Sequence, residues 1–136
     1  MSSETTVRDI MRTIISIDSN AKVRDAARMM VDRNVGSVVV NRGGSPFGIV
    51  TERDLVRKIV AQGSDPSKLS VADVMTAPLT IIDASASLID AARKMGEKRI
   101  KRLIVTEHDK IIGIVTQTDL VQHTTDFGKL AKMGMA

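Results

Sequence analysis

The sequence repeats itself with an offset of 64 or 65 residues, and this repeat constrains the fold more than any single residue does. The stretch Asp25–Met30 returns as Asp90–Met95, and Gly48–Leu55 returns as Gly113–Leu120. Two similar units in one short chain usually pack about a pseudo-twofold axis. We therefore expect residues that recur in both copies to face shared clefts.

The composition is typical of a water-soluble globular protein. The chain has 136 residues, of which 43% are hydrophobic and 26% are charged. A repeat of roughly 60 residues is marginally stable alone, so we expect the two copies to share one core. No apolar run approaches the roughly 18 residues that span a bilayer, and the N-terminal residues do not resemble a signal peptide. We expect a cytoplasmic protein with no membrane partner. The absence of cysteine excludes disulfides and thiolate metal sites.

The net charge of +4 is modest, but basic residues gather in one stretch. This basic cluster consists of Arg93, Lys94, Lys98, Arg99, Lys101 and Arg102. Such a cluster is typical of a solvated helix face, and it is also compatible with an anionic partner. The chain has no Trp or Tyr and two Phe, so it lacks the aromatic residues on which single-stranded nucleic acid stacks. A bound purine would have to lie between aliphatic side chains.

The hydrophobic pattern predicts the same elements in each copy: a short helix, a strand, a helix, two strands and a final helix. The predicted strands are Ile14–Ile17, Ser37–Asn41 and Phe47–Val50 in the first copy, and Leu79–Ile82, Leu103–Thr106 and Ile111–Val115 in the second. The predicted closing helices are Glu52–Gln62 and Gln117–Thr124. We place the first copy at 5–63, a linker at 64–69, the second copy at 70–124 and a weakly helical tail at 125–136.

Both copies carry Gly-Ile-Val-Thr-x-x-Asp, in which a strand leads directly into a helix. Thr51 with Asp54, and Thr116 with Asp119, fit a capping box worth about 1 kcal/mol. The same geometry also suits a nucleotide. A helix N-terminus attracts a phosphate, and a carboxylate one turn further on can accept both hydroxyl groups of a ribose. The two interpretations are compatible, because the threonine hydroxyl can serve the helix and a ligand in turn.

The full order of elements, with Asp-Ala-Ala in the long helix and Gly-Ile-Val-Thr-x-x-Asp opening the last one, resembles the CBS domain (cystathionine β-synthase domain). The two copies resemble the tandem pair called a Bateman module, over about residues 5 to 124. The resemblance implies an α+β fold of two βαββα repeats, packed sheet to sheet about a pseudo-twofold axis. It also implies two clefts that bind adenosyl ligands, with AMP, ADP, ATP and S-adenosylmethionine as equal candidates.

The resemblance further implies which residues bind the ligand. The first cleft would consist of Ile49, Val50, Thr51 and Asp54, with Thr80, Lys101 and Arg102 from the opposite copy. The second cleft would consist of Ile114, Val115, Thr116 and Asp119, with Ile15, Gly36 and Ser37 from the opposite copy. Because Gly36 and Ser37 carry no charge where Lys101 and Arg102 carry two, we expect unequal clefts. The first should prefer a phosphorylated nucleotide, and the second should be empty or take a less charged adenosyl group.

Catalysis is not expected, because the sequence contains no Ser-His-Asp set, P-loop or pair of convergent carboxylates. His108 and His123, in a turn and at a helix end, do not predict a metal site. We therefore expect a non-catalytic regulatory module that forms a homodimer through its amphipathic helices and acts on an unidentified protein. The alternatives are nucleic-acid binding through the basic cluster, or a purely structural dimerisation module with unused clefts.

Overall fold

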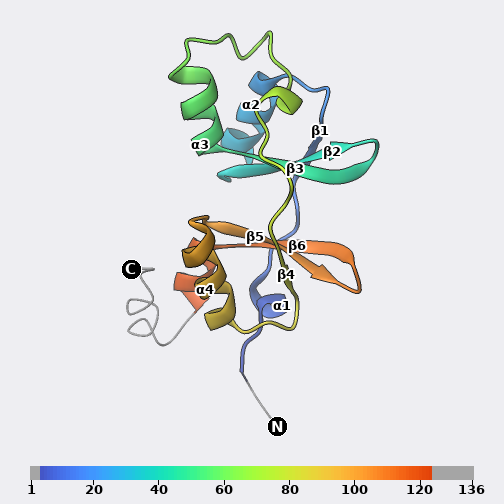
Figure 1. Ribbon diagram of the computed structural model, residues 1–136, viewed down its shortest axis with the longest axis vertical. Coiled ribbons are helices and arrows are strands. Elements are labelled where there is room, and N and C mark those ends of the chain that lie inside the picture. The colour runs from blue at the N-terminus through green and yellow to red at the C-terminus, as the bar shows by residue number, and fades with distance from the viewer. Residues whose placement is uncertain (1–3, 124–136) are drawn as a thin grey trace. The chain divides into compact units, whose positions relative to one another are not determined.

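The computed structural model describes residues 4–123 and divides into two compact units (Figure 1). The first unit is Ile14–Leu79, and the second unit joins the residues up to Thr13 to those from Thr80 onward. The compact units therefore do not coincide with the sequence repeats. The segment that precedes the first strand of each copy belongs to the unit built around the other copy. The tail predicted at 125–136 lies outside the described residues.

The first unit is a three-stranded sheet with helices. Its elements are β1 (Ser16–Asp18), α2 (Val23–Arg33), β2 (Ser37–Arg42), β3 (Ser45–Thr51), α3 (Glu52–Leu55), a π-helix (Val56–Val60) and a 3-10 helix (Val71–Asp73). Strand β1 pairs with β2 in parallel, and β2 pairs with β3 antiparallel. The register between β2 and β3 shifts between Val40 and Asn41.

The second unit has the same topology. Its elements are α1 (Val7–Ile10), β4 (Ile81–Asp83), α4 (Leu88–Lys98), β5 (Arg102–Glu107), β6 (Lys110–Thr116) and α5 (Gln117–His123). Strand β4 is parallel to β5, and β5 is antiparallel to β6. A register shift between Val105 and Thr106 matches the one in the first unit. The predicted α+β fold of two repeats is confirmed.

The long helices form as their apolar spacing predicts, and in each unit they lie against one face of the sheet (Figure 1). Helix α2 buries Val23, Ala26 and Met30. Helix α4 begins after Ser87, whose hydroxyl accepts the Asp90 backbone N–H at 3.0 Å. The helix stripes, together with buried strand residues, form one hydrophobic core in each unit.

Two groups of predicted boundaries differ from the structure. Strands β1 and β4 begin two residues later than predicted, at Ser16 and Ile81, because an apolar run does not show where strand pairing starts. The single helix predicted over Glu52–Gln62 consists of one α-helical stretch followed by the π-helix. The hairpin between β2 and β3 turns at Gly43 and Gly44, whose φ values of 60° and 81° suit glycine.

The segment before the first strand of each copy is held in the unit of the other copy by backbone hydrogen bonds. In the second unit, the Val7 N–H donates to the Ala86 carbonyl at 2.9 Å. In the first unit, the Val71 N–H donates to the Ala21 carbonyl at 2.8 Å. This arrangement positions the end of each segment, at Arg12 or Thr76, beside the strand that leads into a Thr-x-x-Asp motif.

Candidate functional site

Each Thr-x-x-Asp motif caps the helix that follows it. The Thr51 N–H donates to Asp54 Oδ2 at 3.0 Å, and the Asp54 N–H donates to Thr51 Oγ1 at 3.2 Å. In the second unit, the Thr116 N–H donates to Asp119 Oδ2 at 3.0 Å, and the Asp119 N–H donates to Thr116 Oγ1 at 3.1 Å. The capping interpretation is confirmed in both copies.

Capping alone does not explain where these two acids lie. The described residues contain two further boxes, in which Asp9 caps at Thr6 and Asp73 caps at Ser70, and both of these acids are exposed. By contrast, Asp54 is 7% exposed and Asp119 is 1% exposed. A cap works equally well at the surface, and burying a carboxylate is costly unless its oxygens are paired. The two recurring acids are thus set apart from ordinary caps by their burial.

The Asp54 carboxylate is surrounded by polar groups that belong to the first unit. The Thr76 hydroxyl donates to Asp54 Oδ1 at 3.0 Å, and Lys58 Nζ lies 3.1 Å from the same oxygen. Lys58 Nζ also donates to the Val74 carbonyl at 2.8 Å. We call Thr51, Asp54, Lys58 and Thr76 the Asp54 site. Both carboxylate oxygens are engaged, and Oδ1 is the one with side-chain partners from outside the cap.

The Asp119 carboxylate has a different set of partners in the second unit. Arg12 Nε donates to Asp119 Oδ1 at 2.7 Å, which makes a charge-assisted hydrogen bond. His123 Nδ1 lies 3.0 Å from the Asp119 backbone carbonyl rather than from its carboxylate. We call Arg12, Thr116, Asp119 and His123 the Asp119 site.

The repeat relates the two sites position by position. Arg12 is the counterpart of Thr76, and His123 is the counterpart of Lys58. In the Asp54 site the cation beside the acid is Lys58, from the helical turn after the motif. In the Asp119 site it is Arg12, from the segment before β1. The clefts predicted from the sequence include none of Arg12, Lys58, Thr76 and His123. Aligning the two copies at the offset of 64 or 65 residues would have paired Arg12 with Thr76 and His123 with Lys58.

The recurring glycine of the motif explains how Thr76 and Arg12 come so close. A Cβ atom on Gly48 would lie 2.9 Å from the Thr76 carbonyl oxygen and 2.9 Å from Met75 Sδ. A Cβ atom on Gly113 would lie 3.0 Å from the Arg12 carbonyl oxygen and 2.7 Å from Met11 Sδ. Glycine thus permits the backbone approach that places a side chain on each acid.

We expect Gly48→Ala to destabilise the protein by about 1–3 kcal/mol, because the added methyl overpacks against a backbone carbonyl. Urea unfolding measures this change, with Gly43→Ala as a control at a position of open space and positive φ. The control separates overpacking from backbone strain. An unchanged unfolding free energy for Gly48→Ala would contradict the close approach.

The predicted cleft residues divide between the two units. Of the first set, Ile49, Val50, Thr51 and Asp54 lie in the first unit, and Thr80, Lys101 and Arg102 lie in the second. Of the second set, Ile15, Gly36 and Ser37 lie in the first unit, and Ile114, Val115, Thr116 and Asp119 lie in the second. Within the second unit, Arg102 is the strand partner of Thr116, and the Lys101 carbonyl accepts the Gln117 N–H at 2.7 Å.

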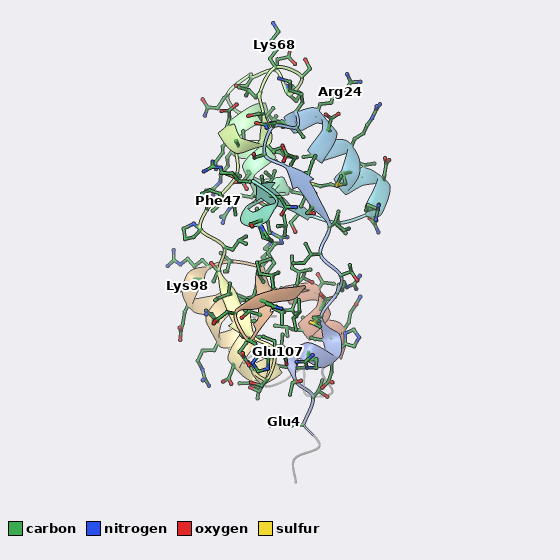
Figure 2. All side chains as sticks on the ribbon, turned by 90° about the vertical axis from the view of Figure 1, so that its right-hand side faces the viewer. Glu4, Arg24, Phe47, Lys68, Lys98 and Glu107 are labelled. Atoms are coloured by element: carbon green, nitrogen blue, oxygen red, sulfur yellow. The ribbon has the colours of Figure 1, made fainter. Side chains whose placement is uncertain are left out.

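The basic cluster lies on α4 and at the start of β5. Lys98, Arg99 and Lys101 are exposed, and Figure 2 shows Lys98 at the surface. Lys94 Nζ donates to the Ile81 carbonyl, and Arg93 lies 3.6 Å from Asp90. Within residues 4–123, no group of three or more acidic or histidine side chains is arranged to hold a metal ion. None of the helices described there is long and apolar enough to cross a membrane.

Comparison with known proteins identifies the family. The sequence profile of the CBS domain matches residues 7–61 and 71–126. The chain belongs to the CBS domain family. A tandem CBS protein, it is 38% identical over 113 residues to the uncharacterized protein MK0525 of Methanopyrus kandleri, and the match covers 82% of this chain and 58% of that protein. The chain therefore corresponds to little more than half the length of this relative.

Solved structures agree with the assignment. A protein with CBS domains from Burkholderia ambifaria has a TM-score of 0.83 and 34% identity, with 87% of this chain and 92% of that chain covered. A hexameric CBS-CP12 protein from bloom-forming cyanobacteria has a TM-score of 0.83 and 28% identity, with 93% and 71% covered. The fold of two CBS repeats is thus shared with proteins of similar sequence.

Proposed function

We propose that this tandem CBS protein is a non-catalytic ligand-sensing module that binds an adenine nucleotide or a related adenosyl compound through the Asp54 site. The observation that carries the proposal is the burial of the recurring acid. Within residues 4–123, four capping boxes share an aspartate that accepts the backbone N–H of its N-cap residue, and the acids of the two Gly-Ile-Val-Thr-x-x-Asp motifs are the buried ones. A buried carboxylate surrounded by exchangeable donors is suited to accept the hydroxyl groups of a ribose.

The ligand would exchange with groups already on the acid. Asp54 Oδ2 serves the helix cap, and Oδ1 accepts the Thr76 hydroxyl and contacts Lys58. Thr76 is an exposed residue, so its hydroxyl can turn to water when a ribose hydroxyl takes its place, while Lys58 stays beside the acid. A hydroxyl that replaces a hydroxyl leaves no buried group unpaired, which keeps the cost of the exchange low.

The proposal assigns further contacts by resemblance to the family. Ile49 and Val50 would line the base, Thr80 would contact the ligand, and Lys101 and Arg102 would contact its phosphates. A ligand that is held by both CBS repeats stabilises the arrangement in which it binds, and so shifts the population towards that arrangement. We further propose that the protein acts as a homodimer that signals to a separate protein. The hexameric state of the CBS-CP12 relative supports self-association.

A thermal-shift screen tests the proposed function. The purified protein is heated with AMP, ADP, ATP, S-adenosylmethionine and, as a control for the base, GMP. An adenosyl ligand at a hundredfold its Kd should stabilise the protein by about 2.7 kcal/mol. If no adenosyl compound raises the midpoint of unfolding, the proposal fails and the clefts are unused.

The exposed cations Lys98, Arg99 and Lys101 favour nucleic-acid binding as the second candidate function. Duplex DNA would then bind with an affinity that falls steeply with salt and depends little on sequence. A gel-shift titration at about 50 mM and 200 mM salt distinguishes this behaviour from the binding of a single nucleotide. Strong salt-dependent DNA binding without any nucleotide response would favour this alternative.

A further inference from the structure

We propose that Arg12 closes the Asp119 site to nucleotides, so that each chain binds one nucleotide, at the Asp54 site. This inference rests on the proposed function and extends it to the number and location of the sites. It derives from the partners of the two acids, and not from the difference between Gly36-Ser37 and Lys101-Arg102.

The Asp119 carboxylate is already occupied by Arg12. Arg12 Nε lies 2.7 Å from Asp119 Oδ1, the oxygen that corresponds to the one holding Thr76 and Lys58 in the other copy. The Arg12 side chain is 60% exposed, whereas the Asp119 side chain is 1% exposed. The guanidinium therefore lies on the solvent side of the carboxylate. It occupies the oxygen that a ribose hydroxyl would need.

The free-energy cost of replacing a group on the acid by a ribose hydroxyl differs between the two sites. At the Asp54 site, displacing Thr76 removes a neutral hydroxyl, and Lys58 is available four residues along the helix to balance the acid. At the Asp119 site, displacing Arg12 removes the cation itself. His123, the counterpart of Lys58, has Nδ1 on the Asp119 backbone carbonyl and not on the carboxylate. A neutral ribose hydroxyl cannot replace the charge of Arg12, so the exchange is unfavourable.

The backbone of Arg12 is fixed beside the acid by two hydrogen bonds with Ile114. Its N–H donates to the Ile114 carbonyl at 2.8 Å, and its carbonyl accepts the Ile114 N–H at 3.0 Å. This bridge, which the absence of a side chain on Gly113 permits, holds the Arg12 backbone beside the acid. Thr76 has the same two hydrogen bonds with Ile49. Because the backbone placement is the same, the difference between the sites lies in the side chains, Arg12 against Thr76 and His123 against Lys58.

The inference is tested by exchanging the partners between the sites. Arg12→Thr combined with His123→Lys gives the Asp119 site the polar groups of the Asp54 site while keeping a cation near the acid. Thr76→Arg gives the Asp54 site the cation of the other copy at an exposed position. Thr76→Ala is the matched control, because the ligand would displace the Thr76 hydroxyl rather than bind it, so its removal takes no contact from the ligand and adds no charge. Calorimetric titration with AMP measures the number of sites per chain, and circular dichroism checks the fold.

We expect one site in the wild-type protein, two in the Arg12→Thr/His123→Lys variant, none in Thr76→Arg and one in Thr76→Ala. Adding Asp54→Asn to the double variant should leave one site. Two sites in the wild-type protein would overturn the inference while leaving nucleotide binding intact. A wild-type protein that binds no AMP or other adenosyl compound would overturn the proposed function and this inference together. If the double variant does not fold, normal binding by Thr76→Arg overturns the inference by itself.

Discussion

Asp54→Asn is expected to lower the affinity for AMP about 100-fold while the protein stays folded. The two ribose hydroxyls would donate to a charged acceptor, and such hydrogen bonds contribute about 1.5–3 kcal/mol each, against about 0.5–1.5 kcal/mol for the neutral acceptor that asparagine offers. Loss of about 2.7 kcal/mol corresponds to a 100-fold rise in Kd. Asparagine keeps one oxygen that can accept the Thr51 N–H, so the helix cap is retained in part. Isothermal titration calorimetry measures the change.

Asp73→Asn is the matched control for this prediction. Asp73 has the same place in a capping box, since its Oδ2 accepts the Ser70 N–H at 3.0 Å, but the residue is exposed. We expect this variant to bind AMP as the wild-type protein does. Equal losses of affinity in both variants would show that the effect comes from helix capping and not from a ribose contact.

Leu120→Ala is expected to destabilise the protein by about 3 kcal/mol, within the range of about 2–5 kcal/mol for buried leucines. Leu120 is fully buried in the core of the second unit and directly follows Asp119 in α5. Truncation removes packing and leaves a cavity where this helix meets the sheet. Urea denaturation measures the free energy of unfolding.

Leu120→Met controls for volume, because a swap that conserves volume costs less than about 1.5 kcal/mol. The comparison separates the loss of packing from a general intolerance of substitution at this position. A cost below about 1 kcal/mol for Leu120→Ala would contradict the placement of this side chain in the core.

Much of the fold follows from local pattern. The apolar spacing of α2 and α4 predicts helices whose stripes are buried, and Gly43-Gly44 predicts the hairpin. These features depend on near neighbours in sequence. Val7–Met11 and Val71–Met75 each belong to the unit built around the other sequence copy, and this placement depends on long-range backbone pairing, which periodicity does not reveal.

In the candidate site, too, the local features could be predicted and the tertiary contacts could not. Asp54 and Asp119 are evident from the repeated motif, and their capping role follows from spacing. Their burial, and the ion pairs with Lys58 and Arg12, depend on tertiary contacts. Arg12 is 107 residues from Asp119 along the chain, so no local signal connects them. The repeat was the one sequence feature that could have pointed to Arg12 and Thr76 as counterparts.

A crystal structure of the protein grown with AMP tests the central claim most directly. We predict electron density for the nucleotide with its ribose hydroxyls within hydrogen-bonding distance of Asp54 Oδ1. We also predict that Arg12 remains on Asp119, with no nucleotide there. Density for AMP bound away from Asp54, or crystals without bound AMP at saturating concentration, would contradict the account.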